Sequence, residues 1–270
     1  MTTYQDALKN ASKIIDNFDA ELILSYVTGK SRAKIYSEMK SKLPKIDESR
    51  FSQFTQKRFN GFPLAYITGV KDFWKGEFKV TKDVLIPRPE TEVLIEQVLK
   101  EDLEGKKLLE LGTGSGCIAI SLANETNNLS IYATDFSVEA ILIARENSEI
   151  NKSKNIIFIN HDWREEWLFP SVDFIISNPP DVDKKDIKKD EDGIWYEPEI
   201  ALFSENQGLA DIEIIIKKSF QFLNNKGKLF LEHSPRQQSL IKKIANDSNF
   251  KSVYFKEDLN KDIRFSILEK

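Results

Sequence analysis

Cysteine and histidine are scarce in this chain of 270 residues, which holds one of the first and two of the second. A lone cysteine, Cys117, excludes an intrachain disulfide. Two isolated histidines, His161 and His233, are too few for a zinc site of histidine and cysteine ligands. No apolar stretch approaches the roughly 18 residues of a membrane-spanning helix, and MTTYQDALKN lacks the regions of a signal peptide. We therefore expect a cytoplasmic protein without metal or membrane.

A strong excess of one charge is also lacking, because 39 Lys and Arg stand against 43 Asp and Glu. The distribution is uneven: residues 1–70 hold 11 basic and 7 acidic side chains, so the remainder is acidic. A weakly basic N-terminal part suits an acidic partner or nucleic acid, and equally a solvated helical surface. The acidic remainder argues against stable nucleic-acid binding.

Hydrophobic periodicity divides the chain into a helical part and an alternating part. Residues 4–60 predict several short helices, and residues 72–81 predict a hairpin, because aromatic and β-branched residues flank a turn. Strands are expected at 107–111, 130–135, 155–160, 172–178, 228–233, 251–256 and 263–268, with helices at 117–125, 137–150, 209–223 and 235–247. This pattern predicts an α/β fold with a doubly wound, mainly parallel sheet of seven strands. No helix separates the last two strands, so one of them should run antiparallel at an edge.

These patterns predict three parts of the chain: a small N-terminal helical domain at residues 1–70, a connecting β-hairpin at 71–86, and a sheet domain at 87–270. The charged run DKKDIKKDED at 183–192 predicts a solvated loop within the last part.

The segment LLELGTGSGCIA has the form of a strand, a glycine-rich turn and a helix. Glycines at 112, 114 and 116 allow a ligand to approach the backbone, although a tight strand-to-helix connection would look the same. Asp135 ends the next strand, where a carboxylate can accept both hydroxyls of a ribose. The spacing departs from that of dinucleotide sites, which place a third glycine where Cys117 stands. Glu110 adds a carboxylate that suits a cationic ligand, so the pattern favours S-adenosylmethionine over NAD.

The segment SNPPDV places an asparagine and two prolines directly after an apolar strand. Because proline fixes its own φ angle, Asn178, Pro179 and Pro180 predict a rigid polar corner. Such a corner can hold a planar amide or amine by fixed hydrogen bonds.

Together these motifs resemble a class I S-adenosylmethionine-dependent methyltransferase of the type that methylates amino groups. Within that class the chain resembles the HemK-like peptide chain release factor glutamine methyltransferases. The resemblance runs almost end to end, through PLAYITGVKDFW, LIPRPETE, LLELGTGSGCIAISLA, HDW, NPP, WYEPEIAL, GLADIEIII and LFLEH.

The resemblance implies a role for specific residues of this chain. The cofactor side would comprise the loop, the ribose acid, an adenine-side pair and the catalytic asparagine: Gly112, Thr113, Gly114, Ser115, Gly116, Asp135, Asp162, Trp163 and Asn178. In catalysis, Asn178 Oδ1 and the Pro179 carbonyl would each accept a hydrogen from the acceptor amide. The substrate side would comprise Asn178, Pro179, Pro180, Asp181, Phe73 and Trp74. The family has an aromatic residue, usually Tyr, after the two prolines, whereas this chain has Asp181.

The expected function is methyl transfer from S-adenosylmethionine to the glutamine amide of the Gly-Gly-Gln motif of release factors. The N-terminal helical domain would help to grip that protein partner. Two alternatives remain open at this point. One is methylation of an exocyclic amine of adenine in nucleic acid, which would require an aromatic platform for a flipped base. The other is a cofactor-binding module with weakened catalysis that binds release factors.

Overall fold

The computed structural model describes residues 2–185, 193–258 and 260–270, so most of the charged run at 183–192 lies outside the described residues. The chain divides into two compact units. The first contains the residues up to Val70 together with residues 193–196, and the second contains the remainder. Within the described residues, no helix is both long enough and apolar enough to cross a bilayer.

The first unit is helical, as the sequence predicts. Its elements are α1 (Tyr4–Ala11), α2 (Asn17–Thr28), α3 (Arg32–Ser37), α4 (Lys45–Phe59), α5 (Leu64–Thr68) and the 3-10 turn η1 (Ile194–Tyr196). Thr3 begins α1 with a capping box, in which its hydroxyl accepts from the Asp6 amide while the Asp6 carboxylate accepts from Thr3. Gly29 and Gly69, both left-handed, end α2 and α5. The unit has its own apolar core around Ile23.

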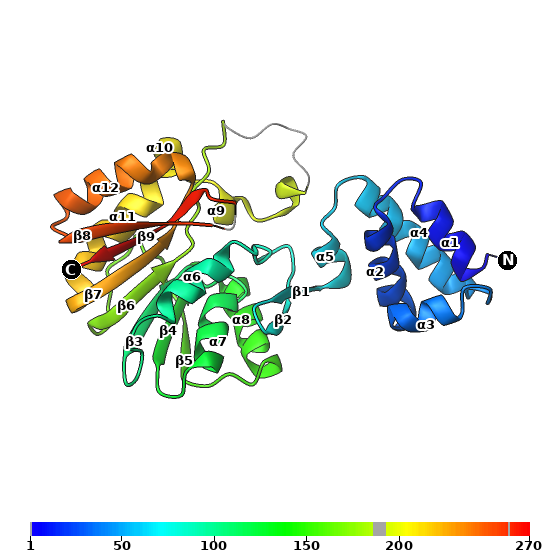
Figure 1. The fold of residues 1–270 in the computed structure, drawn as a ribbon, viewed down its shortest axis with the longest axis horizontal. Coiled ribbons are helices and arrows are strands. Elements are labelled where there is room, and N and C mark those ends of the chain that lie inside the picture. Colours follow the sequence, from blue (N-terminus) through cyan, green and yellow to red (C-terminus); the bar gives the residue numbers. More distant parts are fainter. Residues whose placement is uncertain (1, 186–192, 259) are drawn as a thin grey trace. The chain divides into compact units, whose positions relative to one another are not determined.

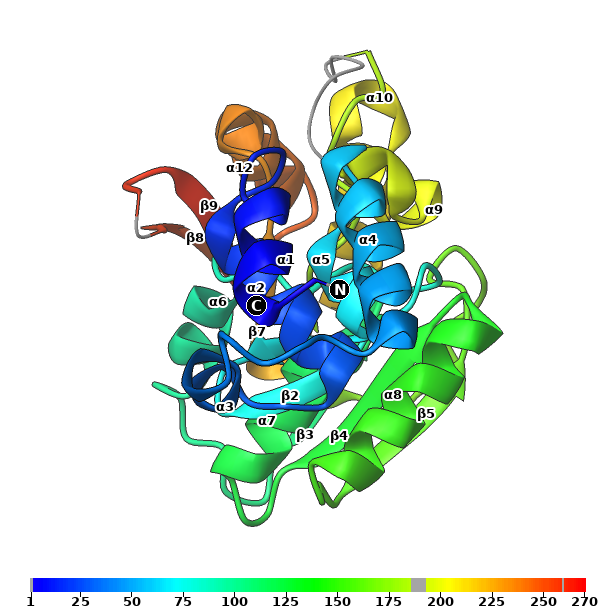
Figure 2. The ribbon, with the colours of Figure 1, turned by 90° about the vertical axis from the view of Figure 1, so that its right-hand side faces the viewer.

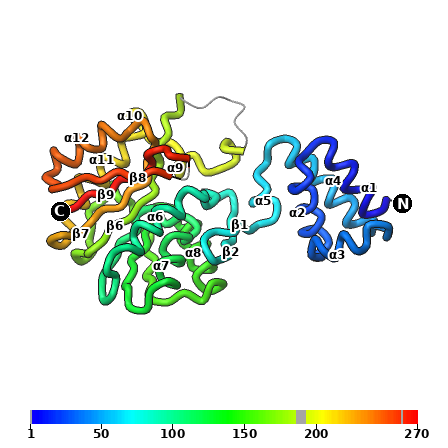
Figure 3. The backbone as a smooth tube through the Cα atoms, viewed as in Figure 1, coloured from blue at the N-terminus to red at the C-terminus, as the bar shows by residue number. Residues whose placement is uncertain are grey.

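The predicted hairpin is formed by β1 (Val70–Phe73) and β2 (Gly76–Lys79), and the tube in Figure 3 shows the chain passing from α5 into it. Trp74 takes a left-handed φ of 54° in the turn, a position that the sequence does not reveal. The chain then reaches α6 (Thr91–Val98), which starts directly after the segment PRPE at 87–90.

The second unit is built on a seven-stranded sheet. Its strands are β3 (Lys107–Leu111), β4 (Ser130–Asp135), β5 (Ile156–Asn160), β6 (Val172–Ser177), β7 (Leu223–Glu232), β8 (Ser252–Glu257) and β9 (Ile263–Glu269). They lie in the order β5-β4-β3-β6-β7-β9-β8. The pairs among β5, β4, β3, β6 and β7 are parallel, which confirms the doubly wound sheet.

The position of the antiparallel strand corrects one expectation. β9 pairs antiparallel with both β7 and β8, so the antiparallel strand is inserted one place in from the edge, and β8 forms the edge. A hairpin at the end of a chain places its strands side by side, but the sequence does not say which one contacts the sheet.

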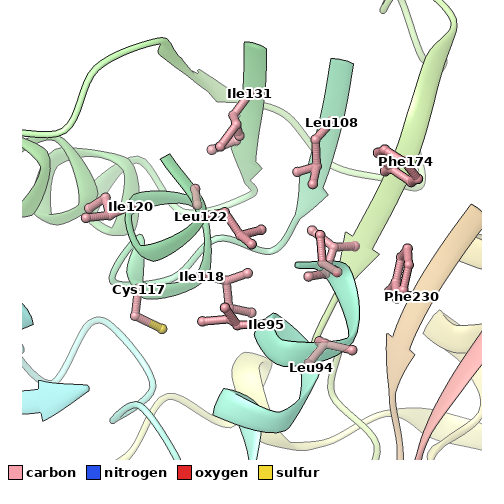
Figure 4. Close-up of a cluster of buried hydrophobic side chains, with 14 of the residues drawn as sticks. Leu94, Ile95, Leu108, Cys117, Ile118, Ile120, Leu122, Ile131, Phe174 and Phe230 are labelled. Carbon is pink, nitrogen blue, oxygen red and sulfur yellow. The ribbon is translucent and has the colours of Figure 1, made fainter. Parts of the chain in front are cut away.

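Helices cover both faces of the sheet (Figure 1). The helices of this unit are α7 (Cys117–Glu125), α8 (Val138–Ile150), α9 (Glu199–Leu202), α10 (Glu205–Gly208), α11 (Ala210–Phe222) and α12 (Gln238–Asp247), with the 3-10 turn η2 (Pro235–Gln237) before α12. α6 and α7 pack on one face, where Leu94 and Ile118 meet Leu108 and Phe174 of the strands (Figure 4). α11 and α12 pack on the other face. Figure 2 shows α8 running beside β4 and β5.

Candidate active site

The glycine-rich loop follows β3 directly and leads into α7. Gly112 and Gly116 have φ angles of 75° and 81°, in the left-handed region that side chains rarely adopt. A Cβ added at Gly112 would lie 2.9 Å from the ring of Trp163, and one at Gly116 would lie 2.9 Å from Ile120. The Gly112 amide donates to the Thr134 carbonyl at 2.9 Å, which fastens the loop to β4. Both conformation and space therefore require glycine at these two positions.

Asn147 of α8 supports the loop from behind. This fully buried side chain donates from Nδ2 to the Ser115 carbonyl at 2.8 Å and to the Lys79 carbonyl at 2.9 Å. Its Oδ1 accepts from the Lys79 amide at 2.7 Å. One side chain thus joins the loop, α8 and the hairpin. The only signal in the sequence is a polar residue on the apolar face of a helix.

Glu110 lies beneath the loop and is only 1% exposed. Its Oε2 accepts from the Thr113 hydroxyl at 2.6 Å, whereas its buried Oε1 has no hydrogen-bond partner of good geometry among the described residues. Burial raises the pKa of Glu110 to about 7, and the nearby charge of Asp135 adds to the rise. A cation bound above Thr113 would favour the ionised form of this carboxyl.

Asp135 ends β4, where the sequence places a ribose acid. Its Oδ2 accepts from the Gly114 amide at 2.8 Å and its Oδ1 from the Ser137 amide at 2.9 Å. Each oxygen keeps a further lone pair for a ligand hydroxyl. Burial raises the pKa of this carboxyl, and the two amides counter the rise. The carboxylate is thus held in a fixed orientation at the loop.

Trp163 packs against the loop and is held by a residue that the sequence analysis did not single out. Its Nε1 donates to Asp211 Oδ1 of α11 at 3.0 Å, and the Asp211 carboxylate also pairs with Arg164 at 2.6 Å. Asp162, the other member of the predicted adenine-side pair, accepts from the Arg164 amide at 2.8 Å. Trp163 is therefore fixed in position as an apolar wall.

The asparagine-proline corner follows β6 at the same edge of the sheet. Asn178 Nδ2 donates to the Thr91 hydroxyl at 3.2 Å, at the first turn of α6. Pro179 and Pro180 are both buried. The corner is thus fixed by its own prolines and by a neighbouring helix.

One pocket brings most of these groups together. The predicted residues that line it are Gly112, Thr113, Gly114, Ser115, Asp135, Trp163, Asn178 and Pro180. The other lining residues include Thr91, Cys117, Phe136 and Arg164. The thiol of Cys117 stays protonated, because burial raises its pKa to about 12. The predicted loop, ribose acid and corner therefore share one cavity.

Six predicted residues are not among the described residues that line this pocket, namely Gly116, Asp162, Pro179, Asp181, Phe73 and Trp74. Gly116 is the N-cap of α7. Phe73 is 2% exposed and packs edge-on against Phe78 in the core. Trp74 donates from Nε1 to Glu125 at 2.7 Å. These placements give no support to the expected substrate role of Phe73 and Trp74.

Asp181 directly follows the corner and is not among the described residues that line the pocket. Burial raises its pKa to about 6, and Arg264 of β9 opposes this rise. It also adds to the raised pKa of Glu232, the last residue of β7. Its carbonyl accepts from Gln237 Nε2 at 2.8 Å. Asp181 is half-buried and therefore interacts electrostatically with the buried Glu232 and with Arg264.

Glu197 anchors the segment that returns to the pocket. This side chain is 6% exposed and accepts from the Ile86 amide at 3.0 Å and from Arg88 at 2.5 Å. Pro198, which follows it, and Arg88 both line the pocket. Glu197 thus links the segment after the charged run to the proline-rich segment before α6 by hydrogen bonds.

The chain matches known proteins along almost its whole length. Residues 2–69 match the PrmC N-terminal domain, and residues 89–193 match the methyltransferase small domain. A release factor glutamine methyltransferase of Buchnera aphidicola is 38% identical, over 95% of this chain and 93% of that protein. The one of Coxiella burnetii is 36% identical, over 96% of both.

The chain belongs to the release factor glutamine methyltransferase family. Another relative, from Salmonella typhimurium, is 34% identical over 87% of this chain and 85% of that protein. Membership in this family confirms the predicted methyltransferase activity.

Comparison with solved structures gives the same fold for this chain. The catalytic domain of hMettl16 matches with a TM-score of 0.57 at 18% identity, covering 83% of this chain and 81% of that one. A methyltransferase from Pyrococcus furiosus matches with a TM-score of 0.55 at 20% identity, covering 81% and 98%. These likenesses confirm the class I methyltransferase fold.

Proposed function

We propose that this methyltransferase transfers a methyl group from S-adenosylmethionine to the glutamine amide of the Gly-Gly-Gln motif of peptide chain release factors. The observation that carries the proposal is the position of Asn178 in the same pocket as the glycine loop and Asp135. A fixed amide thereby faces a cavity suited to a nucleoside ligand. The names of the family members support the same protein substrate.

The residues of the pocket fit S-adenosylmethionine, which would supply a methyl group on a positively charged sulfur. Gly112 to Gly116 would let the ligand approach the backbone. Asp135 would accept the ribose hydroxyls with its remaining lone pairs, and Trp163 would cover the adenine. The carboxylate of Glu110, beneath Thr113, would favour the positive end of the ligand. Asp162 would accept from the exocyclic amine of adenine after a side-chain rotation.

Asn178 would position the acceptor at the other end of the pocket. An amide nitrogen is a poor nucleophile because its lone pair is delocalised into the carbonyl. Asn178 Oδ1 and the carbonyl of Pro179 would each accept one of its hydrogens, and Pro180 would line the same cavity. Two fixed acceptors align the nitrogen and stabilise the charge that it gains, and such positioning can contribute about 7–11 kcal/mol at most.

Adenine in nucleic acid is a weaker candidate substrate for this corner. Enzymes that act on a base stack it on aromatic side chains. The residue after the two prolines is Asp181, whose negative charge adds to the raised pKa of Glu232. The residue that directly follows the two prolines is therefore not aromatic.

The N-terminal helices are proposed to help grip the release factor, with residues 1–70 as the recognition part, residues 71–86 as the linker and residues 87–270 as the catalytic part. The match of residues 2–69 to the PrmC N-terminal domain supports the bounds of the helical part. We place the reaction in the cytoplasm, where release factors act.

Three acceptors offered with labelled S-adenosylmethionine test the proposal: a release factor, the same factor with the motif glutamine replaced by alanine, and an adenine-containing oligonucleotide. Label should enter the first alone. Labelling of the oligonucleotide would favour the adenine alternative. Binding of cofactor and release factor without any labelling would favour a module with weakened catalysis.

A further inference from the structure

The amide of Asn178 has two ends of similar shape, and only one of them suits the proposed reaction. Oδ1 accepts hydrogens, whereas Nδ2 donates them. In the structure Nδ2 donates to the Thr91 hydroxyl at 3.2 Å, which leaves Oδ1 free to face an acceptor amide. A group that fixes this orientation would therefore control catalysis.

Thr91 is placed to act as that group. It is the first residue of α6, it is 2% exposed, and it lines the pocket beside Asn178. No hydrogen bond of good geometry joins its hydroxyl to the Glu232 carboxyl at the end of β7 among the described residues, but the two groups are close enough for Thr91 to lower the pKa of that carboxyl. Three side chains thus form a row: Asn178 directly after β6, Thr91 of α6 and Glu232 of β7.

The second carboxyl oxygen of Glu232 shows that this row is buried and incompletely paired. Glu232 is 8% exposed, and its Oε2 is buried without a hydrogen-bond partner among the described residues. A buried carboxyl normally finds partners for both oxygens, because an unmet one costs free energy. Packing alone does not explain a glutamate here.

We propose that Thr91 and Glu232 are positioning residues that set the direction of the Asn178 amide, an inference that rests on the proposed function. The Thr91 hydroxyl has one hydrogen. When that hydrogen is donated to an ionised Glu232, Thr91 can only accept from its other neighbour. Asn178 must then present Nδ2 to Thr91 and Oδ1 to the pocket.

Protonation of Glu232 removes this constraint. A neutral carboxyl can donate to Thr91, which can then donate its own hydrogen to Oδ1 of a rotated amide. Burial raises the pKa of Glu232 to about 8. Asp181 after β6 and Glu90 before α6 add to the rise, while Thr91 and Arg264 of β9 oppose it. The productive orientation should therefore become fixed as the pH rises through this range.

Two substitutions of Thr91 test the proposal in the full-length enzyme with a release factor as substrate. Thr91→Val keeps the shape and removes the hydroxyl, so kcat at saturating S-adenosylmethionine should fall about tenfold or more. Thr91→Ser keeps the hydroxyl and should stay within about twofold of the parent. Affinity for S-adenosylhomocysteine should change little in both. An unchanged kcat in the valine variant, or an equal loss in both, would overturn the role of the hydroxyl.

Glu232→Gln tests the ionisation step with an isosteric group that cannot lose a proton. The parent kcat should rise with pH around 8, and the variant should lose this rise. A variant that keeps the parent profile would contradict the proposal. Saturation with cofactor separates this effect from Glu110, whose ionisation bears on cofactor binding.

The side-chain amide resonances of Asn178 give a readout that needs no turnover, and they can be assigned by their absence in Asn178→Asp. They should shift with pH around 8 in the parent, and not in Glu232→Gln. If the resonances titrate but no release factor is methylated, the proposed function fails and the positioning row stands. If methylation occurs and the resonances do not titrate, the row fails alone.

Discussion

At the scale of single residues, different side chains of the pocket are proposed to bind the cofactor and to position the acceptor amide. Asp135 is held by two backbone amides at the glycine loop. Asn178 is held by Thr91 at the corner. The two side chains belong to different strand ends and share no hydrogen bond with each other among those of the described residues. Substitutions at the two positions should therefore have separable effects.

Asp135→Ala should weaken the binding of S-adenosylhomocysteine, because ribose hydroxyls would lose a charged acceptor. Hydrogen bonds to charged groups contribute roughly 1.5–3 kcal/mol each. Calorimetry measures the change, with the exposed Asp102→Ala as a matched control that should bind like the parent. Equal affinity of the Asp135 variant and the control for S-adenosylhomocysteine would show that Asp135 does not bind the ribose hydroxyls.

Asn178→Ala should spare cofactor binding and lower the rate of methyl transfer by about a hundredfold or more, because the acceptor nitrogen is no longer held. Single-turnover rates with bound cofactor isolate the chemical step. A variant that works at the parent rate would show that the corner is structural.

At the scale of elements, three polar side chains fix the pocket by joining pieces that are distant in sequence. Asn147 joins α8 to the loop and the hairpin. Asp211 joins α11 to Trp163, and Glu197 clasps the corner before α6. Each replaces backbone pairing that irregular segments cannot supply.

Asn147→Ala should lower the free energy of unfolding by about 2–4 kcal/mol, since it removes the hydrogen bonds that this side chain makes to the Lys79 amide and to the Lys79 and Ser115 carbonyls. Asn151→Ala is the matched control, because Asn151 also donates to the hairpin, at the Glu77 carbonyl, but on the exposed surface. Asn151→Ala should lower the free energy of unfolding by less than about 1 kcal/mol. Urea denaturation compares the two, and similar losses would contradict a special role for Asn147.

The sequence predicted the elements that carry strong local signals. The apolar strands β3 and β6, the glycine loop and the asparagine-proline corner were all placed correctly, because composition and proline or glycine fix them locally. The place of β9 inside the sheet was not predictable, since it depends on pairing between distant strands. The same holds for Thr91 and Glu232, which meet only when α6 and β7 come together. The short helices α9 and α10 have too few residues for a periodic signal.

At the scale of the whole molecule, two buried carboxyls couple the stability of the protein to pH. Burial raises the pKa of Glu110 to about 7 and that of Glu232 to about 8, from an ordinary value of 4.5. The folded state therefore holds these protons more tightly than the unfolded chain does. Their contribution to stability is complete below about pH 4.5 and is lost as the pH rises through 7 and 8.

The cofactor-free protein should accordingly lose stability between about pH 5 and pH 8, by an amount of the order of a few kcal/mol. The double variant Glu110→Gln with Glu232→Gln should show a flatter profile. Chemical denaturation at several pH values measures both. A parent whose stability rises over this range with a slope equal to that of the variant would contradict the assignment.

We expect this chain to methylate the glutamine of a Gly-Gly-Gln motif. Tandem mass spectrometry of a release factor, after incubation with the protein and S-adenosylmethionine, tests it most directly. One added methyl group should appear on the side-chain nitrogen of that glutamine, and none should appear when Asn178→Ala replaces the parent protein. An unmodified motif glutamine after full incubation, or a methyl group at any other residue, would contradict the proposed glutamine methylation.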